Sequence, residues 1–379
     1  MAGMNTDNHP RRILLAVTGL TPQIVTETLY ALACREQAPW IPDEIHLVTT
    51  ATGAENARLN LLLPDGWFHR LCADYHLPAI QFPVENIHIL RDAGGKAMDD
   101  IRTPQQNTLA ADFITETVRR LTEDPTTELH VSIAGGRKTM GYYLGYALSL
   151  YGRPQDRLSH VLVSDPYETN REFYYPTPYD HPIHSKRGDR EITVDARNAQ
   201  VDLADIPFVR LREGLPERLR KGQSGFSQVI ATANRGLEPP RLILNLADRQ
   251  AWVDDARLDL GNTEFIFLLW LAERSSRDEA ATDWSTPAMV EEFLGVAARV
   301  LNTMGGDFER IEKALTWRKP SAIKTAKYFE PHKSRVNRAI EEELGTVAAA
   351  RYLVTRVRED ETALFYLPLA ASQIAIVQQ

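Results

Sequence analysis

The sequence of 379 residues is poor in cysteine and has no long apolar run. Cys34 and Cys72 are its only cysteines and form no CxxC pair, which argues against a disulfide scaffold and against a thiolate zinc site. No uninterrupted apolar run approaches the roughly 18 residues of a membrane span, and the N-terminus lacks the features of a signal peptide. We therefore expect a cytoplasmic protein that does not contact membranes.

Several phosphate and metal motifs are also missing. A P-loop needs GxxxxGK[ST], but Val131 stands five residues before Gly136, and Arg137 intervenes before Lys138. The dinucleotide fingerprint GxGxxG follows no predicted strand, because "VTGLTPQ" has a single glycine. No HExxH motif or cluster of Asp and His occurs near the strand ends, so we expect neither a metal site nor a cofactor.

The first half of the sequence alternates short apolar strands with helical stretches. The strands are "RRILLAVTG", "EIHLVTTATG", "NIHILRDAGG", "ELHVSIAGG" and "RLSHVLVSD", and the helices include "TPQIVTETLYALA", "NTLAADFITETVRRLT" and "KTMGYYLGYALSLYG". Buried strands separated by helices are typical of a parallel sheet. Residues 10–195 are therefore predicted to form an α/β domain with a doubly wound, mostly parallel, Rossmann-like sheet.

Three strand ends of this domain carry small, hydroxyl-bearing or basic residues. In a doubly wound sheet the ligand binds where the strand order reverses, at the carboxyl ends of the strands. Glycines and free helix N–H groups at such ends suit an oxygen anion. The predicted ligand-binding residues are Gly19, Thr21, Gln23, Thr49, Thr50, Gly135, Gly136, Arg137, Thr139 and Met140, and Thr52 belongs to the same group.

Two segments of this domain resemble a known family. "AVTGLTPQIVTETLYAL" and "HVSIAGGRKTMGYYLGYAL" look like the two signature segments of CRISPR-associated Rossmann fold (CARF) proteins, with Arg137 where threonine is common. The likeness covers residues 10–200, and "DAGGKAMDDIRTPQQN", "YALSLYGRPQDRLSHVLV" and "FYYPTP" extend it to a subfamily of ring nucleases. The resemblance implies a homodimer that binds a cyclic oligoadenylate, most simply the tetra-adenylate, across its two-fold axis.

Cleavage of such a ligand could proceed without metal. Its own 2′-hydroxyl would attack the adjacent phosphorus while cations and amides stabilise the developing charge, which leaves linear products with a 2′,3′-cyclic phosphate. Lys138 is the predicted charge-stabilising residue, with Thr18 and Arg102 as further catalytic candidates. Two matches to the nuclease pattern R-x4–6-H, which begin at Arg70 and Arg153, are no more than chance predicts.

The second half of the sequence has a different organisation. Residues 196–240 are polar and predict a helical connector, and residues 241–372 resemble a winged helix-turn-helix domain of the response-regulator type. That resemblance rests on an antiparallel sheet that includes Leu242 and Leu244, a helix capped by Thr263, a helix in "PHKSRVNRAIEEEL" and a hairpin near residues 359–362.

A local basic patch lies in this second half, although the formal net charge of the chain is -8. Residues 309–338 hold nine Lys or Arg and three Glu, and a recognition helix would present Lys333, Arg335 and Arg338 to DNA. A solvated helix face or a dimerisation module would explain the same charges.

The sequence thus leaves three hypotheses open. The first is a metal-independent ring nuclease that acts on cyclic oligoadenylate. The second is a DNA-binding transcriptional regulator that senses the same ligand without cleaving it. The third is an ordinary nucleotide-binding Rossmann enzyme, which the missing fingerprints disfavour.

Overall fold

The computed structural model describes residues 10–35, 38–187, 190–222, 225–235, 239–279, 281–284, 286–316, 322–359 and 362–378. The chain divides into two compact units. The first extends to Arg212 and includes Gly225–Ser227, and the second comprises Glu213–Ser224 and Gln228–Gln379.

A six-stranded sheet forms the centre of the first unit. Its strands lie in the order β3 (Ile87–Ile89), β2 (Glu44–Thr49), β1 (Arg11–Val17), β4 (Thr127–Ser132), β5 (Arg157–Val163) and β8 (Val201–Asp205). All neighbouring pairs are parallel except β5 and β8. The strand order runs outward from β1 in one direction and then restarts with β4 on the other side, so the predicted doubly wound, mostly parallel sheet is confirmed.

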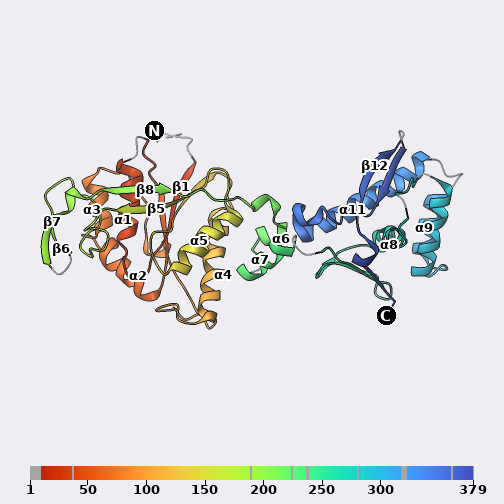
Figure 1. Cartoon of the computed structure of the whole chain (residues 1–379), viewed down its shortest axis with the longest axis horizontal. Coiled ribbons are helices and arrows are strands. Elements are labelled where there is room, and N and C mark those ends of the chain that lie inside the picture. Colours follow the sequence, from red (N-terminus) through yellow and green to blue (C-terminus); the bar gives the residue numbers. More distant parts are fainter. Residues whose placement is uncertain are drawn as a thin grey trace, which may run out of the picture. The chain divides into compact units, whose positions relative to one another are not determined.

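Helices cover both faces of this sheet (Figure 1). One face carries α1 (Gln23–Tyr30), which continues into a π-helical turn, α2 (Ala51–Ala57) and α3 (Trp67–Asp74). The other carries the packed pair α4 (Pro104–Leu121) and α5 (Lys138–Tyr151). Leu14, Leu15 and Ala16 of β1 are completely buried because helices close the sheet from both sides.

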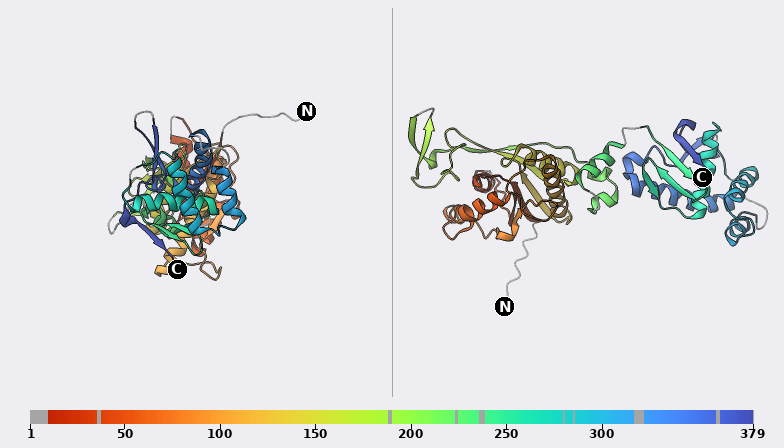
Figure 2. Two further views of the ribbon diagram at one scale, coloured as in Figure 1. Left: turned by 90° about the vertical axis from the view of Figure 1, so that its right-hand side faces the viewer. Right: turned by 90° about the horizontal axis from the view of Figure 1, so that it is seen from below.

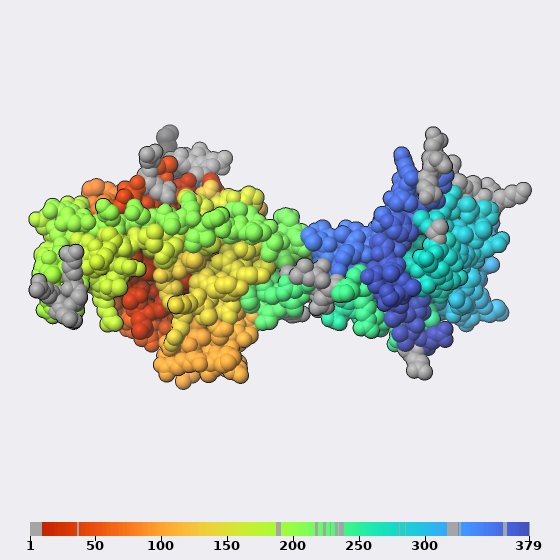
Figure 3. Space-filling view, viewed as in Figure 1, coloured from red at the N-terminus to blue at the C-terminus, as the bar shows by residue number. Residues whose placement is uncertain are grey.

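The sheet continues beyond the predicted end of the first domain. Residues 201–205, which the sequence analysis places in a helical connector, form β8 instead and pair antiparallel with β5. The five residues "VDLAD" include two carboxylates, so they lack the apolar run typical of a buried strand. A hairpin of β6 (Pro182–Arg187) and β7 (Arg190–Asp195) precedes β8 and stands apart from the sheet (Figure 2). Figure 3 shows this light-green stretch along the surface of the first unit.

The second unit contains a four-stranded sheet and a set of helices. The sheet order is β11 (Ala256–Leu258), β10 (Gln250–Val253), β9 (Leu242–Asn245) and β14 (Ile374–Val377). The predicted antiparallel pairing of the first two strands is present, with Leu242 opposite Val253. The helices are α6 (Glu217–Arg220), α7 (Phe226–Arg235), α8 (Asn262–Ser276), α9 (Pro287–Val300), α10 (Gly306–Thr316) and α11 (Ala322–Ala349), and a hairpin of β12 (Thr355–Glu359) and β13 (Thr362–Tyr366) follows them.

One detail of this unit differs from expectation. Helix α8 begins at Asn262 with Gly261 as its N-cap, so the predicted cap Thr263 lies inside the helix. The remainder of α8 is buried on all sides from Glu264 to Ala272. The order of α8, α11 and a terminal hairpin agrees with the predicted layout, while the winged-helix assignment itself stays a prediction.

Candidate ligand-binding site

A cavity of about 750 Å³ opens beside the carboxyl ends of β1 and β4. These strands are neighbours at the point where the order of the sheet reverses, which is where doubly wound folds bind ligands. The cavity brings together most of the predicted site residues: Gly19, Thr50, Thr52, Arg102, Gly136, Arg137, Lys138, Thr139 and Met140. Leu20, Asp99 and Asp100 also line it and are absent from the sequence-based set.

The turn between β4 and α5 depends on its two glycines. Gly136 has a φ of +79°, a conformation that costs side chains other than glycine about 1–2 kcal/mol. A Cβ atom on Gly135 would lie 2.7 Å from the carbonyl oxygen of Val17, which leaves no room for a side chain. This tight turn lets α5 begin directly at the cavity. Its N-cap, Arg137, makes no side-chain capping bond, so the first N–H groups of the helix remain available to an anion.

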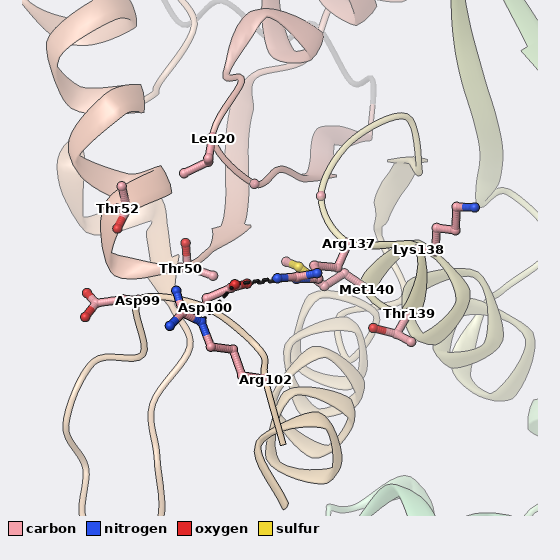
Figure 4. Close-up of a pocket in the computed structure, with 12 residues that line it drawn as sticks. Leu20, Thr50, Thr52, Asp99, Asp100, Arg102, Arg137, Lys138, Thr139 and Met140 are labelled. Atoms are coloured by element: carbon pink, nitrogen blue, oxygen red, sulfur yellow. Dashed lines mark hydrogen bonds and ion pairs between the residues drawn. The ribbon is translucent and has the colours of Figure 1, made fainter. Parts of the chain in front are cut away.

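Asp100 links the two arginines of the cavity. Nε of Arg137 donates to Oδ1 of Asp100 at 2.8 Å, its Nη2 contacts Oδ2, and Nε of Arg102 lies 3.3 Å from Oδ2 (Figure 4). Hydrogen bonds from Arg137, from the N–H of Ile101 and from Arg102 hold the pKa of the Asp100 carboxyl well below its ordinary value. The group is therefore a carboxylate at neutral pH, and it forms an ion pair with Arg137.

A short hairpin delivers Asp99, Asp100 and Arg102 to this site. The N–H of Leu90 donates to Thr49, that of Met98 donates to Leu90, and Met98 is buried. The chain thus leaves β3, turns back and passes over the strand ends. Helix α4 then begins with a capping box of Thr103 and Gln106, whose side chain also accepts from the N–H of Arg102. Arg102 is consequently fixed at its backbone and exposed at its side chain.

Lys138 is the third cation of the cavity. It is exposed, and no ion pair joins it to another described residue. In Figure 4 its ammonium group points away from Asp100 and Arg137. The flexible four-carbon stem of lysine allows that group to turn toward a ligand at the start of α5.

Five predicted site residues lie outside the cavity. Thr18 and Thr49 are fully buried, and their hydroxyls donate to the backbone oxygens of Thr21 (2.6 Å) and Thr18 (2.8 Å). These two threonines therefore hold the strand-end loops in shape instead of facing a ligand. Gly135 packs under β1, and Thr21 and Gln23 line a second cavity on the other side of the β1–α1 loop.

The cavity is chemically suited to a polyanion with hydroxyl groups. Three cations, Arg102, Arg137 and Lys138, outnumber the two carboxylates of Asp99 and Asp100, and the start of α5 adds a partial positive charge. Across the described residues there is no group of three or more His, Cys, Asp or Glu that could hold a metal ion. Within the same residues, no helix combines the length and apolarity needed to cross a membrane.

The predicted DNA-contacting residues lie together on α11 of the second unit. Each is paired with an acid: Lys333 with Glu330 at 2.7 Å, Arg335 with Glu264 at 2.6 Å and Arg338 with Glu342 at 2.8 Å. The ammonium nitrogen of Lys333 also lies over the ring of Phe365 in the hairpin, 5.1 Å from the ring centre. Their charges are thus partly balanced inside the protein.

The arginine of one R-x4–6-H match has a structural role. Arg153 is buried and its guanidinium contacts Asp156 and the hydroxyl of Thr127. Arg70 of the other match stacks over Trp67 on α3. Neither arginine lines the cavity at β1 and β4.

The first unit thus has a Rossmann-like fold with a cation-lined cavity at its topological switch point. The sequence profile of CRISPR-associated protein NE0113 matches residues 21–238, more than half of the chain. The chain therefore belongs to this CRISPR-associated family. Among curated proteins none matches.

Two solved structures align with the chain at low similarity. Enterococcus italicus Csm6 bound to cyclic hexa-2′-fluoro-hexa-dAMP is 10% identical with a TM-score of 0.26, over 86% of this chain and 59% of Csm6. Can2 from Sulfobacillus thermosulfidooxidans in complex with cyclic tetra-adenylate is 12% identical with a TM-score of 0.25, over 94% of this chain and 74% of Can2. The chain thus spans less than two thirds of the length of Csm6.

Proposed function

We propose that the protein is a CARF-type ring nuclease that binds cyclic oligoadenylate, most simply cyclic tetra-adenylate, and opens it slowly without a metal ion. One observation carries this proposal: the cavity at β1 and β4 combines Arg102, Arg137 and Lys138 with the open N-terminus of α5. Membership of a CRISPR-associated family and the two CARF-like sequence segments support the choice of ligand.

Ring opening needs geometry and charge stabilisation more than acid–base groups. The 2′-oxygen forms a bond to the adjacent phosphorus, the bond from phosphorus to the 5′-oxygen breaks, and the 2′-proton passes to water while the leaving oxygen takes one up. Arg102, Arg137 and Lys138 would stabilise the charge on the phosphoryl oxygens. No histidine is found among the described residues that line the cavity, so we expect slow turnover without histidine acid–base catalysis.

The proposed active form is a homodimer. A cyclic tetra-adenylate has two-fold symmetry, so two copies of the cavity related by a two-fold axis would each contact half of the ring. A cavity of about 750 Å³ lies within the usual range for small-molecule sites, which supports half a ring per chain.

The test is incubation of the pure protein with cyclic tetra-adenylate in EDTA, followed by chromatography of the products. We expect linear products with a 2′,3′-cyclic phosphate and a loss of turnover in Lys138→Ala. If the protein binds the ligand but leaves it intact, its function is sensing without cleavage. Absence of binding would refute the proposal.

DNA binding is the alternative function, and the hairpin that follows α11 favours it because winged helices place a hairpin there. Against it, Lys333, Arg335 and Arg338 are all paired with glutamates. The pair of Arg338 with Glu342 is exposed on both sides, and such pairs contribute less than about 1 kcal/mol, so a phosphate could compete for Arg338. Glu264, the partner of Arg335, is buried and also pairs with His332.

A salt titration distinguishes the two functions. Replacing the three cations together by Ala should lower the slope of log affinity against log salt by roughly 2.7 for duplex DNA. Cleavage of the ring should be nearly unchanged. If the wild-type protein binds no duplex at low salt, with or without the ligand, the regulator hypothesis is wrong.

A further inference from the structure

A second, smaller cavity of about 280 Å³ lies on the other side of the β1–α1 loop. Thr21, Gln23, Ile24 and Glu27 line it from the loop and α1, and residues 168–171 line it from the segment after β5. Gly19 and Leu20 of the same loop line the first cavity, and the next residue, Thr21, lines the second. The size is at the lower end for ligand sites and suits a single heterocyclic base.

Glu27 places a buried carboxyl group in this cavity. Glu27 is only 6% exposed, and its carboxyl group makes no hydrogen bond to another described residue. The charged groups that face it are Glu168, which is exposed, and Arg171. Burial, and then repulsion by Glu168, raises the pKa of Glu27 to about 8. At neutral pH the group is therefore largely a neutral acid with one O–H donor.

Gln23 lies one helical turn before Glu27, on the same face of α1. Its Nε2 donates to the carbonyl oxygen of Arg171 at 2.9 Å, and this bond fixes the orientation of the amide because a carbonyl can only accept. Its Oε1 is buried and has no hydrogen-bond partner. Buried polar atoms normally have partners, so this unpaired acceptor one turn from Glu27 leaves a hydrogen bond for an entering polar group to make.

The two groups together select one pattern of donors and acceptors. The Watson–Crick edge of adenine offers the N6 amino group as a donor and N1 as an acceptor, while guanine and hypoxanthine offer an oxygen and an N1–H instead. An acceptor from Gln23 and a donor from neutral Glu27 match adenine and oppose the other two. A cation fits less well, because Glu27 and Glu168 belong to no group of three possible ligands among the described residues.

We infer that the Gln23–Glu27 cavity is an adenine-recognition subsite, in which Oε1 of Gln23 accepts from N6 and the carboxyl of Glu27 donates to N1. The inference rests on the proposed function, since the sugar and phosphate of the same nucleotide would occupy the first cavity beyond Leu20. Glu27 is then a specificity-determining residue for the cyclic oligoadenylate.

The test compares cyclic tetra-adenylate with cyclic tetra-inosinate, which replaces each N6 amino group by oxygen and keeps the ribose–phosphate ring. We expect the wild-type protein to prefer the adenylate at least tenfold at pH 7. Affinity for the adenylate should then fall about tenfold from pH 7 to pH 9, as the protonated fraction of Glu27 falls. Equal affinity for the two rings would overturn the inference without any variant being made.

Two substitutions sharpen the result. Glu27→Ala should reduce the preference to the part that Oε1 of Gln23 supplies, whereas Glu27→Gln, whose amide still donates, should retain a larger preference and lose the dependence on pH. Glu85→Ala, at an exposed acid of the same unit, is the matched control. A preference that is unchanged in Glu27→Ala refutes the subsite. If neither ring binds, or if Lys138→Ala changes neither binding nor cleavage, the proposed function fails and the subsite fails with it.

Discussion

Glu27→Gln should make the stability of the protein less dependent on pH. In the unfolded chain the Glu27 carboxyl ionises with its ordinary pKa of 4.5, and in the fold its pKa is about 8. Between these values the folded state binds the additional proton, so stability falls as the pH rises through the window. The amide that replaces the carboxyl in the variant carries no charge in either state, so the substitution removes that fall.

The magnitude follows from the two pKa values. At 1.36 kcal/mol per pKa unit, wild-type protein loses about 3 kcal/mol of stability between pH 4.5 and pH 7, and about 5 kcal/mol once the pH exceeds 8. The effect is not strongly screened because Glu27 is buried. It is large beside the total stability of a typical domain, which is about 5–15 kcal/mol.

The assay is urea unfolding of both proteins at pH 5, 6.5 and 8. The comparison uses the unfolding transition of the first unit, because a chain with two compact units need not unfold in one two-state step. The stability of the variant relative to wild type should rise steadily with pH, while Glu85→Gln should show no such trend. A constant difference across this range would mean that Glu27 is already ionised in the fold, and the reasoning about its burial would be wrong.

Further substitutions test the first cavity. Lys138→Ala should weaken binding or turnover of cyclic tetra-adenylate at least tenfold, because a charge-assisted phosphate bond contributes about 1.5–3 kcal/mol; unchanged titration and cleavage would remove Lys138 from the site. Arg102→Ala should impair turnover and leave the melting temperature nearly unchanged. The control Arg58→Ala, outside the cavity, should change neither turnover nor melting temperature. If Arg102→Ala lowered only the melting temperature, the role of Arg102 would be structural. Thr18→Ala should cost about 1 kcal/mol of stability through the lost bond to the loop, with Thr18→Ser restoring it; a loss of turnover at full stability would contradict this role. Gly136→Ala should cost about 1–2 kcal/mol because of its φ of +79°, measured by urea unfolding; a neutral effect would place that turn in another conformation.

The parts of the site that could be predicted are local in sequence. Gly136, Arg137 and Lys138 follow one another where an apolar run ends and a helix begins, so their shared location at a strand end needs no knowledge of the sheet. The parallel sheet could also be predicted from the sequence, because buried strands alternate with helices over the whole first unit. Most of the predicted lining residues belong to these two patterns.

The remaining site residues depend on contacts that no local pattern reveals. Asp100 reaches the cavity only because the chain folds back after β3 and anchors Met98 beneath it. Gln23 faces a different cavity from Gly19 because the β1–α1 loop turns between them. Glu27 reads as an ordinary polar position of a helix until the segment after β5 buries it. Thr50 and Thr52 line the first cavity as predicted, but the hydroxyls of Thr18 and Thr49 donate to backbone carbonyls instead.

The ion pair of Asp100 with Arg137 also sets a threshold for what can enter the first cavity. Asp100 is tethered beside its partner, so it competes with any incoming anion at a high effective concentration. When a lone phosphate binds Arg137, it replaces the carboxylate of Asp100 as the partner of that arginine, so little binding free energy is gained. A ring that holds several phosphates at fixed spacing meets Arg102, Lys138 and the start of α5 in the same encounter, and each further contact is then intramolecular. Under the proposed function, this pair would favour a ligand with several phosphates over one with a single phosphate.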